Sequence, residues 1–350
     1  MPFYDGTKIL SLKDIDGFDP DLYLCTSNRS AGKTTFFGRW FVRRYIKQGE
    51  KFVLLYRWGY ELQDVATKFF NDLEPLFFPG YKMTDKQRHK GIYTELFLSP
   101  PDSDAPQTCG YALALNKADQ IKKVSHIFND VQRMLFDEFM PETGEYCSNE
   151  IEKFYSIHKS IARGHGEQVR RVPVYMISNP VTILNPYYAA LGISDRLNAD
   201  TKFLRGRGWV MEQGYNDSAK QAEEQSGFYK ALGGTKYGAY GAQGVYLSDS
   251  DTFIQPPNGR GQYLATIRYN GVDFAVRAFP NDGIVYCDKA VDGSYPHKLS
   301  VTTDDHQINY VMLAQYRSFV DQMRYFFERG SFRFFDQQSK QAILQALSYR

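Results

Sequence analysis

The chain has 350 residues and a net charge of +2, with 43% hydrophobic and 23% charged residues. This composition is typical of a soluble globular protein long enough for two domains, and it excludes a largely disordered chain. The near-neutral charge excludes a uniformly basic DNA-binding domain, so any contact with DNA must use a local patch. No apolar run approaches the roughly 18 residues of a membrane span, and the four cysteines form no C-x-x-C pair for zinc. We therefore expect no membrane partner and a reducing compartment.

A phosphate-binding loop is predicted between the apolar run 22–25 and a helical pattern that ends near Gly49. Its residues are Ser27, Asn28, Arg29, Ser30, Ala31, Gly32, Lys33, Thr34 and Thr35. A Walker A loop wraps backbone N–H groups around phosphates, places its lysine on the β- and γ-phosphates and puts its Thr hydroxyl on Mg²⁺. Lys33 and Thr34 fit these roles, although Ser27 stands where the G-x-x-x-x-G-K-[ST] pattern has its first glycine. The alternative is a chance A-G-K-T-T at the start of an ordinary helix.

A buried strand is predicted over residues 52–56 and a helix over residues 60–76. Arg57 follows the strand at the edge where ligands collect in open α/β sheets. This arginine is a candidate nucleotide sensor or intersubunit contact, and a surface position is equally plausible. The alternating segment 81–98 predicts a basic hairpin that either contacts DNA phosphates or is simply solvated.

A Walker B strand is predicted about a hundred residues after the loop, over residues 131–138. The apolar run 134–136 brings Asp137 to the end of the strand, where it can hold the water shell of Mg²⁺. Glu138 follows at the position that activates the attacking water. The alternative is a strand that ends in a solvated acidic turn, but two motifs in the correct order favour a nucleotide hydrolase.

A helical pattern over residues 149–162 and a strand over residues 172–177 follow. This strand ends in Ser178 and Asn179, which could hydrogen-bond the γ-phosphate or form an Asn-Pro turn. Strands and helices alternate throughout this part of the chain, a pattern typical of a mainly parallel α/β sheet.

Composition predicts three regions along the chain. Residues 1–208 form the ATP-binding domain, residues 209–245 a polar, glycine-rich linker or lid, and residues 246–350 a smaller domain. The last region begins as a β meander over 261–291 and closes with two helical patterns, the first over 308–328.

With these motifs identified, the chain resembles the viral DNA-packaging ATPases, that is, the large terminase subunits. In size it is most similar to the compact DNA-encapsidation ATPases of small tailed phages. Arg29 matches the R-x-x-G-K-T form of Walker A that is frequent in that family, and the family often lacks the first glycine, which agrees with Ser27. The motifs that carry this resemblance lie between residues 20 and 180.

The resemblance implies a P-loop ATPase domain of the ASCE class with ATP and Mg²⁺ as cofactors. Thr34 and Asp137 would hold the metal, and Asn179 would belong to a coupling motif after Walker B. Catalysis would use Glu138, Arg29 and an arginine finger given in trans to the neighbouring subunit of a homo-oligomeric ring. Arg163 is the first candidate for the finger, with Arg170 and Arg171 as alternatives.

The function implied is an ATP-driven motor that translocates double-stranded viral DNA into a procapsid. Its partners would be the procapsid portal, possibly with a packaging RNA, and it would work in the host cytoplasm, transiently on the procapsid. A P-loop nucleotide kinase and a nucleotide-gated docking protein without turnover are the alternatives.

The family's second domain is an RNase H-like nuclease whose first strand carries a metal-binding aspartate. The corresponding strand here has Arg268 instead, which predicts an α+β, degenerate domain without cleavage activity. Its acidic residues are expected near turns, as solvated side chains; they are Asp273, Asp282, Asp288 and Asp292.

Overall fold

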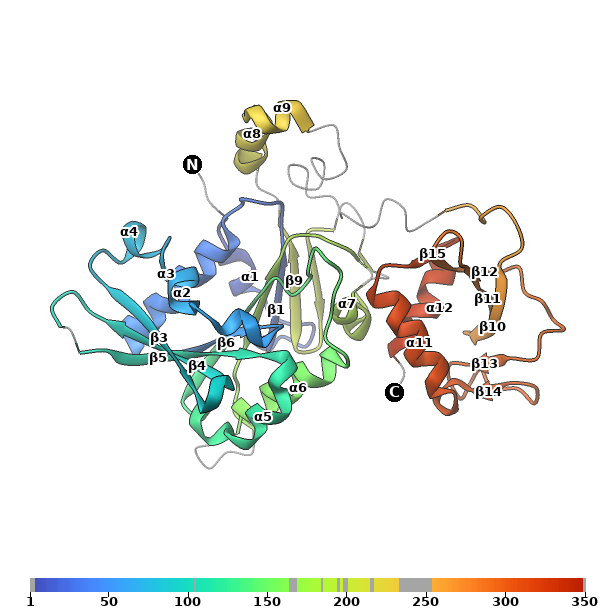
Figure 1. The fold of residues 1–350 in the computed structure, drawn as a ribbon, viewed down its shortest axis with the longest axis horizontal. Helices are drawn as coiled ribbons and strands as arrows, with labels where there is room; N and C mark the ends of the chain where they lie inside the picture. Colours follow the sequence, from blue (N-terminus) through green and yellow to red (C-terminus); the bar gives the residue numbers. More distant parts are fainter. Residues whose placement is uncertain are drawn as a thin grey trace. The chain divides into compact units, whose positions relative to one another are not determined.

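The computed structural model describes residues 4–348 except 104, 164–168, 184, 194–195, 198–200, 215–216 and 233–253. The chain divides into two compact units, each with its own sheet (Figure 1). The first comprises Met1–Pro141, Tyr146–Pro180 and Asp200–Val245, and the second Glu142–Glu145, Val181–Ala199 and Tyr246–Arg350. The glycine-rich stretch of the predicted linker, 233–242, lies outside the described residues.

A nine-stranded sheet forms the first unit, in the order β3-β4-β5-β2-β6-β7-β1-β9-β8. The central strands from β5 to β9 in this order are parallel, whereas β3, β4 and β8 run antiparallel to their neighbours. The strands are β1 Leu22–Thr26, β2 Lys51–Tyr56, β3 Lys82–Arg88, β4 Tyr93–Ser99, β5 Gln107–Ala114, β6 Val131–Asp137, β7 Val174–Ser178, β8 Phe203–Gly206 and β9 Trp209–Gln213.

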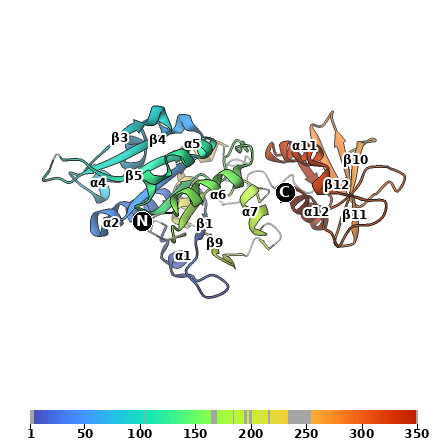
Figure 2. The same ribbon diagram turned by 90° about the horizontal axis from the view of Figure 1, so that it is seen from below.

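Helices connect the parallel strands, and α5 and α6 lie side by side in both Figure 1 and Figure 2. Buried aromatic residues attach α2 to the sheet: Phe41 packs against Phe52 of β2 and Tyr175 of β7. The helices of this unit are α1 Thr7–Ser11, α2 Lys33–Gln48, α3 Val65–Phe70, α4 Glu74–Phe77, α5 Ala118–Lys123, α6 Glu150–Ile161, α8 Asp217–Gln225 and α9 Gly227–Leu232, with 3₁₀ turns η1 Gly59–Leu62, η2 His89–Gly91, η3 Leu115–Lys117 and η4 Ser125–Phe128.

Two sequence predictions in this unit need correction. The helix expected over 60–76 is divided into η1, α3 and α4, because Asp64 adopts a left-handed conformation and Pro75 can only begin a new helix. The boundary at 208/209 is also wrong. Strand β9, the first part of the predicted linker, pairs with β1 in parallel and completes the sheet. The side chains from Trp209 to Glu212 are buried. The apolar part of this strand is only three residues long, which is too short to predict a strand in front of the polar sequence that follows.

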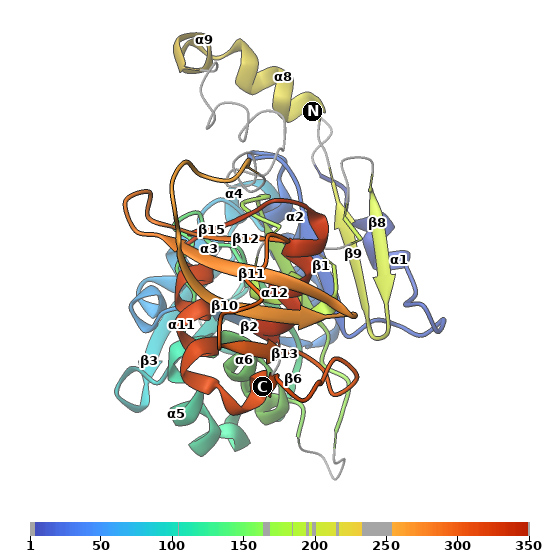
Figure 3. The same ribbon diagram turned by 90° about the vertical axis from the view of Figure 1, so that its right-hand side faces the viewer.

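A mixed six-stranded sheet forms the second unit, in the order β14-β13-β10-β11-β12-β15. Strands β10, β11 and β12 are antiparallel, and the others join in parallel. Helix α12 packs against β10, β12 and β15 (Figure 3). The elements are β10 Gln262–Tyr269, β11 Val272–Phe279, β12 Ile284–Asp288, β13 Lys298–Ser300, β14 Val311–Met312, β15 Phe332–Phe334, α7 Pro186–Leu191, η5 Leu313–Gln315, α11 Arg317–Glu328 and α12 Gln337–Ser348.

The helix expected over 308–328 begins only at Arg317, because Val311 and Met312 pair with β13 instead. The described residues include no helix that is both long and apolar enough to cross a membrane.

Candidate nucleotide site

The phosphate-binding loop lies between β1 and α2, as its sequence predicts. Ser30 and Gly32 both have left-handed backbone conformations, with φ of 57° and 92°, so the chain turns sharply before α2 begins at Lys33. Glycine takes this conformation without the steric cost of a Cβ atom. Ser27 and Asn28 are buried at the start of the loop. The helix therefore presents its N-terminal N–H groups to the concave side of the loop, as an anion site requires.

Lys33 is buried in the loop, and its ammonium group is held by four oxygen atoms. Lys33 Nζ donates to Ser27 O at 3.1 Å, Ser27 Oγ at 2.8 Å, Asn28 O at 3.3 Å and Asn179 Oδ1 at 3.1 Å. Burial lowers the pKa of Lys33, because removal from water disfavours its charged form. Ser27, the departure from the Walker A pattern, thus supplies a hydroxyl that orients the lysine.

Thr34 and Asp137 meet across the loop. Thr34 Oγ1 donates to Asp137 Oδ2 at 2.8 Å, and Asp137 is the last residue of β6. Loss of water around Asp137 raises the pKa of its carboxyl group, and the Thr34 hydrogen bond and the Lys33 charge act in the opposite direction. The two side chains together offer a hydroxyl and a carboxylate oxygen, the hard ligands that Mg²⁺ prefers.

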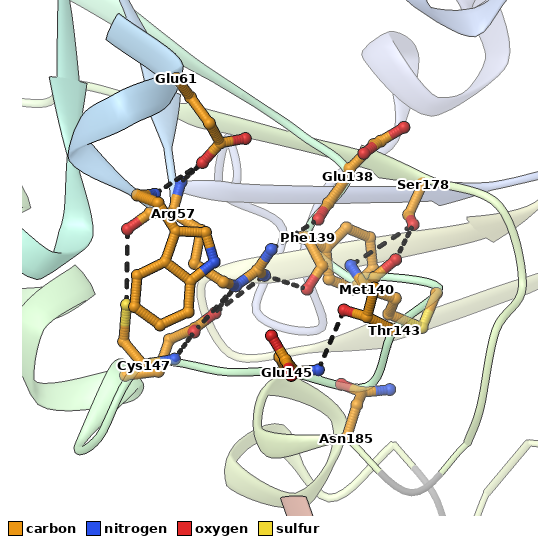
Figure 4. A network of polar contacts seen from close by, with 12 residues as sticks. Arg57, Glu61, Glu138, Phe139, Met140, Thr143, Glu145, Cys147, Ser178 and Asn185 are labelled. Atoms are coloured by element: carbon orange, nitrogen blue, oxygen red, sulfur yellow. Dashed lines mark hydrogen bonds and ion pairs between the residues drawn. The ribbon is translucent and has the colours of Figure 1, made fainter. Parts of the chain in front are cut away.

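Glu138 follows Asp137 and has an exposed side chain. Its backbone is left-handed, with φ of 55°, and its N–H donates to Asp137 Oδ1 at 2.9 Å. This conformation turns the chain at the end of β6. Figure 4 shows the Glu138 carboxylate pointing away from the Arg57 side chain.

The end of β7 contributes to the same sheet edge. Ser178 Oγ accepts from Met140 N at 3.3 Å and donates to Met140 O at 3.0 Å. Asn179, the next residue, contacts Lys33 as described above. The two residues of the predicted Ser-Asn pair therefore have different contacts. Ser178 binds the backbone of Met140, two residues after Glu138, and Asn179 binds Lys33 of the phosphate-binding loop.

The remaining loop residues differ in their exposure. Ser30 is exposed, Arg29 and Thr35 are partly buried, and Ala31 is buried with its carbonyl accepting from Tyr4 N at 2.8 Å.

The three candidate finger arginines have different environments. Arg170 donates to the carbonyl groups of Val131, Phe128 and Ile161 within its own subunit. Arg171 donates to Pro20 O at 2.5 Å and lies 3.4 Å from Asp21.

Arg163 is exposed, one residue beyond the C-cap of α6. It makes no hydrogen bond or ion pair within the described part of the chain, although 164–168 lie outside that part.

Two buried polar clusters escaped the sequence analysis. Arg57 is 5% exposed and pairs with buried Glu150, so the surface position considered for this arginine is wrong (Figure 4). On the other side of the loop, Tyr4 Oη donates to Glu212 Oε2 at 2.5 Å and accepts from Cys25 Sγ at 2.9 Å. In the sequence, the second cluster is indicated only by Glu212, an acidic residue that directly follows the apolar residues of β9.

The acidic residues of the second unit are not all solvated turn residues. Arg268 Nη1 lies 2.9 Å from Asp273 Oδ1, which occupies the facing position on β11. Asp288 is buried on β12 and pairs with Arg277 at 2.5 Å, which corrects its expected place in a turn. Within the described residues, no three His, Cys, Asp or Glu side chains gather as a metal site.

This combination of fold and site defines a P-loop ATPase. A loop after β1 leads into helix α2 of a mainly parallel sheet. Strand β6, which β7 separates from β1, ends at Asp137 directly before Glu138. The chain belongs to the Podovirus DNA encapsidation protein (Gp16) family, whose model matches residues 2–348. Family membership confirms the resemblance drawn from the motifs, and with it a viral genome-packaging ATPase.

Individual relatives are similar over most of their length. The chain is 26% identical to the DNA packaging protein of Bacillus phage phi29 over 318 residues, which cover 90% of this chain and 87% of the relative. It is 24% identical to that of Bacillus phage B103 over 302 residues, covering 86% and 87%.

Solved structures share the fold. The phi29 viral genome packaging motor assembly matches with a TM-score of 0.55 and 24% identity, covering 96% of this chain and 95% of that one. The Phi-28 gp11 DNA packaging motor matches with a TM-score of 0.56 and 15% identity, covering 99% and 98%.

Proposed function

We propose that this protein is an ATP-driven motor that translocates double-stranded viral DNA into a procapsid. The observation that carries the proposal is the 2.8 Å contact between Thr34 and Asp137, which joins the phosphate-binding loop to the last residue of β6, directly before Glu138. The chain's membership in a DNA encapsidation family supports DNA as the substrate of the motor.

ATP with Mg²⁺ fits the residues of the loop. Backbone N–H groups of residues 27–35 would surround the β-phosphate, and Lys33 would move its ammonium group from Ser27 and Asn179 to the phosphate oxygens. Thr34 and Asp137 would hold the metal directly and through its water shell. When bound, Mg²⁺ neutralises charge on the β- and γ-phosphates.

Hydrolysis requires a base and charge stabilisation at the γ-phosphate. Glu138, exposed at the end of β6, would orient the attacking water and accept its proton. Arg29, partly exposed on the loop, would contribute a second cation to the phosphates. Asn179 would exchange its contact with Lys33 for one with the γ-phosphate, which would link the nucleotide state to β7.

Arg163 would complete the site of the adjacent subunit in a homo-oligomeric ring. Its exposure supports this role, and the use of the Arg170 and Arg171 side chains within their own subunit argues against those alternatives. The ring would work in the host cytoplasm and dock transiently on the portal of the procapsid, possibly with a packaging RNA. The phi29 relative is part of a viral genome packaging motor assembly, which supports this arrangement.

The second unit would bind partners or the DNA backbone without cutting DNA. A mixed sheet of three antiparallel strands joined by parallel ones is compatible with an RNase H-like ancestry. Its first strand, β10, carries Arg268 in an ion pair with Asp273, so a cation occupies the place where a two-metal nuclease needs a carboxylate.

Measurement of ATP turnover with and without double-stranded DNA and procapsids tests the proposal. A motor predicts turnover that DNA and procapsids stimulate, together with protection of the DNA from added nuclease. Turnover that requires a nucleoside or nucleotide acceptor would indicate a kinase instead. ATP binding without turnover under every condition would indicate the docking protein.

A further inference from the structure

The backbone of Tyr4 is hydrogen-bonded to the phosphate-binding loop. Its N–H donates to Ala31 O at 2.8 Å, and both residues are buried. A trans peptide group is planar, so its N–H points away from its C=O. Because Tyr4 holds the Ala31 carbonyl on the outer side of the loop, the N–H of Gly32, which belongs to the same peptide group, points toward the side that receives phosphate. Gly32 O accepts from Phe36 N at 2.9 Å, which fixes the next peptide group as well.

The hydroxyl group of Tyr4 is fixed by residues of two neighbouring strands. Tyr4 Oη donates to Glu212 Oε2 at 2.5 Å and accepts from Cys25 Sγ at 2.9 Å. Cys25 of β1 and Glu212 of β9 are paired in register, so both side chains lie on the same face of the sheet. Glu212 is buried, and burial raises the pKa of its carboxyl group. The Tyr4 hydroxyl group supplies this buried carboxyl group with a hydrogen-bond donor.

Close packing against α2 restricts the segment that carries Tyr4. The centre of the Tyr4 ring is 5.7 Å from that of Phe36 and 6.2 Å from that of Phe37. A Cβ atom on Gly6 would lie 2.3 Å from the Phe36 ring, so the chain after Tyr4 runs directly against the same helix. The place of the Tyr4 N–H therefore depends on two restraints, the packing on α2 and the contact of the hydroxyl group with β9.

We propose that Tyr4, anchored by Glu212, is a positioning residue that directs the Gly32 N–H toward bound phosphate. This inference rests on the proposed binding of ATP by the loop. The Tyr4 ring is buried against α2, so Tyr4 acts through the backbone of Ala31 and not by contact with the nucleotide. The N–H groups at a helix N-terminus bind phosphate before and during the reaction, so a misdirected Gly32 N–H should weaken binding and leave the chemical step intact.

Loss of the hydroxyl contact should therefore raise KM for ATP. Tyr4→Phe and Glu212→Leu each remove one partner, and each should raise KM and weaken the binding of a fluorescent ATP analogue by about tenfold, which corresponds to the loss of one strong hydrogen bond. The kcat value should change by less than about threefold, since the lost interaction is uniform. Glu212→Gln retains an acceptor oxygen and should keep the parent KM. A smaller folded fraction would give the opposite pattern, a lower apparent kcat at an unchanged KM.

A double substitution separates positioning from stability. Removal of one partner leaves the other buried and unpaired, whereas apolar groups at both places can restore stability. Tyr4→Phe combined with Glu212→Leu should therefore unfold at a higher temperature than either single variant and still show the raised KM. Recovery of the parent KM in the double variant would show that the contact only stabilises the fold and would overturn the positioning role. The parent KM in Tyr4→Phe alone would overturn it too.

Asp14 provides a matched control in the same segment before β1. It is buried, and its Oδ2 accepts from Gly208 N at 2.8 Å, directly before β9 and toward the opposite end of that strand from Glu212. Asp14→Ala should lower the unfolding temperature and leave KM for ATP unchanged. An equal rise of KM in Asp14→Ala would show a general effect of this segment on the loop and would overturn the specific role of Tyr4.

Hydrogen exchange of the loop amides measures the local effect. At saturating ATP, the amides of residues 27–35 should be protected in the parent and in Asp14→Ala, and Tyr4→Phe should lose part of this protection. Full protection in Tyr4→Phe would contradict the proposal. Lys33→Ala with the parent affinity for ATP would instead overturn the proposed loop itself. If Lys33→Ala loses affinity while Tyr4→Phe keeps the parent KM, only the role of Tyr4 is wrong.

Discussion

The hydroxyl group of Thr34 donates a 2.8 Å hydrogen bond to Asp137, a residue 103 positions later in the chain. The contact joins the first turn of α2 to the last residue of β6 and defines where a metal would lie. Because the Lys33 ammonium group is held within the same loop, charge and metal ligands converge on one edge of the sheet. The predictions below separate the contributions of these groups.

Lys33→Ala and Glu138→Gln should fail in different ways. Removal of the Lys33 charge should weaken ATP binding, because no other ammonium group occupies that position in the loop. Glu138→Gln should bind ATP at nearly the parent affinity and lose most of its turnover, since an amide cannot accept the proton of water. Equilibrium binding of a fluorescent nucleotide and steady-state phosphate release measure the two effects. Parent-level turnover by Glu138→Gln would disprove the assignment of the base.

The hydroxyl group of Thr34 should determine the Mg²⁺ requirement. Thr34→Val keeps the shape of the side chain but loses the oxygen, whereas Thr34→Ser keeps the oxygen. Loss of a residue that only supports a metal ligand weakens metal binding by roughly 10- to 100-fold. We expect Thr34→Val to raise the Mg²⁺ concentration for half-maximal turnover by at least this factor. Titration of ATP turnover with Mg²⁺ measures this shift. An identical Mg²⁺ dependence in Val and Ser variants would exclude Thr34 as a ligand.

Arg163 should act across a subunit interface. An arginine finger stabilises transition-state charge and contributes on the order of 10³-fold or more to turnover. Arg163→Ala subunits should therefore be inactive alone and regain activity when mixed with Glu138→Gln subunits, since each lacks a different part of the shared site. The absence of rescue at every mixing ratio would argue strongly against a role in trans.

Arg170→Ala should act on stability instead. Its guanidinium binds three backbone carbonyl groups in its own subunit, and hydrogen bonds to charged groups contribute roughly 1.5–3 kcal/mol each. We expect a lower unfolding temperature and no rescue by mixing. A stable but inactive Arg170→Ala protein that Glu138→Gln subunits rescue would identify Arg170 as the finger.

Glu212→Gln should change how stability depends on pH. Burial raises the pKa of Glu212, although the Tyr4 hydrogen bond acts in the opposite direction. The folded protein therefore retains this proton more readily than the unfolded chain, and the parent loses stability as the pH rises from the ordinary glutamate range through the raised pKa. Glutamine can accept the same hydrogen bond without ionising. The unfolding temperature of Glu212→Gln relative to the parent should therefore rise as the pH increases above the ordinary glutamate range of about pH 4. A difference that stays constant with pH would contradict this assignment.

The second unit should leave supercoiled plasmid intact in the presence of Mg²⁺ or Mn²⁺. Arg268 neutralises Asp273, and Arg277 neutralises Asp288, so these carboxylates are engaged in ion pairs. Agarose electrophoresis after incubation with the purified protein checks the prediction. Nicking that disappears in Asp273→Asn or Asp288→Asn would restore the nuclease interpretation.

The sequence alone determined the parts of the site that depend on neighbouring residues. A loop of fixed spacing identifies Lys33 and Thr34, and an apolar strand followed by two acids identifies Asp137 and Glu138. Such motifs can be recognised in the sequence because the backbone geometry of a strand or helix fixes the direction of each side chain from its position in the chain. The same local logic predicted the parallel sheet from alternating strands and helices.

Only the tertiary structure decided which distant residues share a buried environment. Arg57 and Glu150 are 93 positions apart, and Tyr4 and Glu212 are 208 positions apart, so no periodicity connects them. The fold likewise placed β9 in the sheet, where pairing with β1 completes the hydrogen bonds of a short run that is ambiguous by itself. Burial of a side chain depends on the assembled core and not on the neighbouring residues in the sequence. Whether a charged side chain stabilises the fold or acts in the site depends on the partners that long-range packing places beside it.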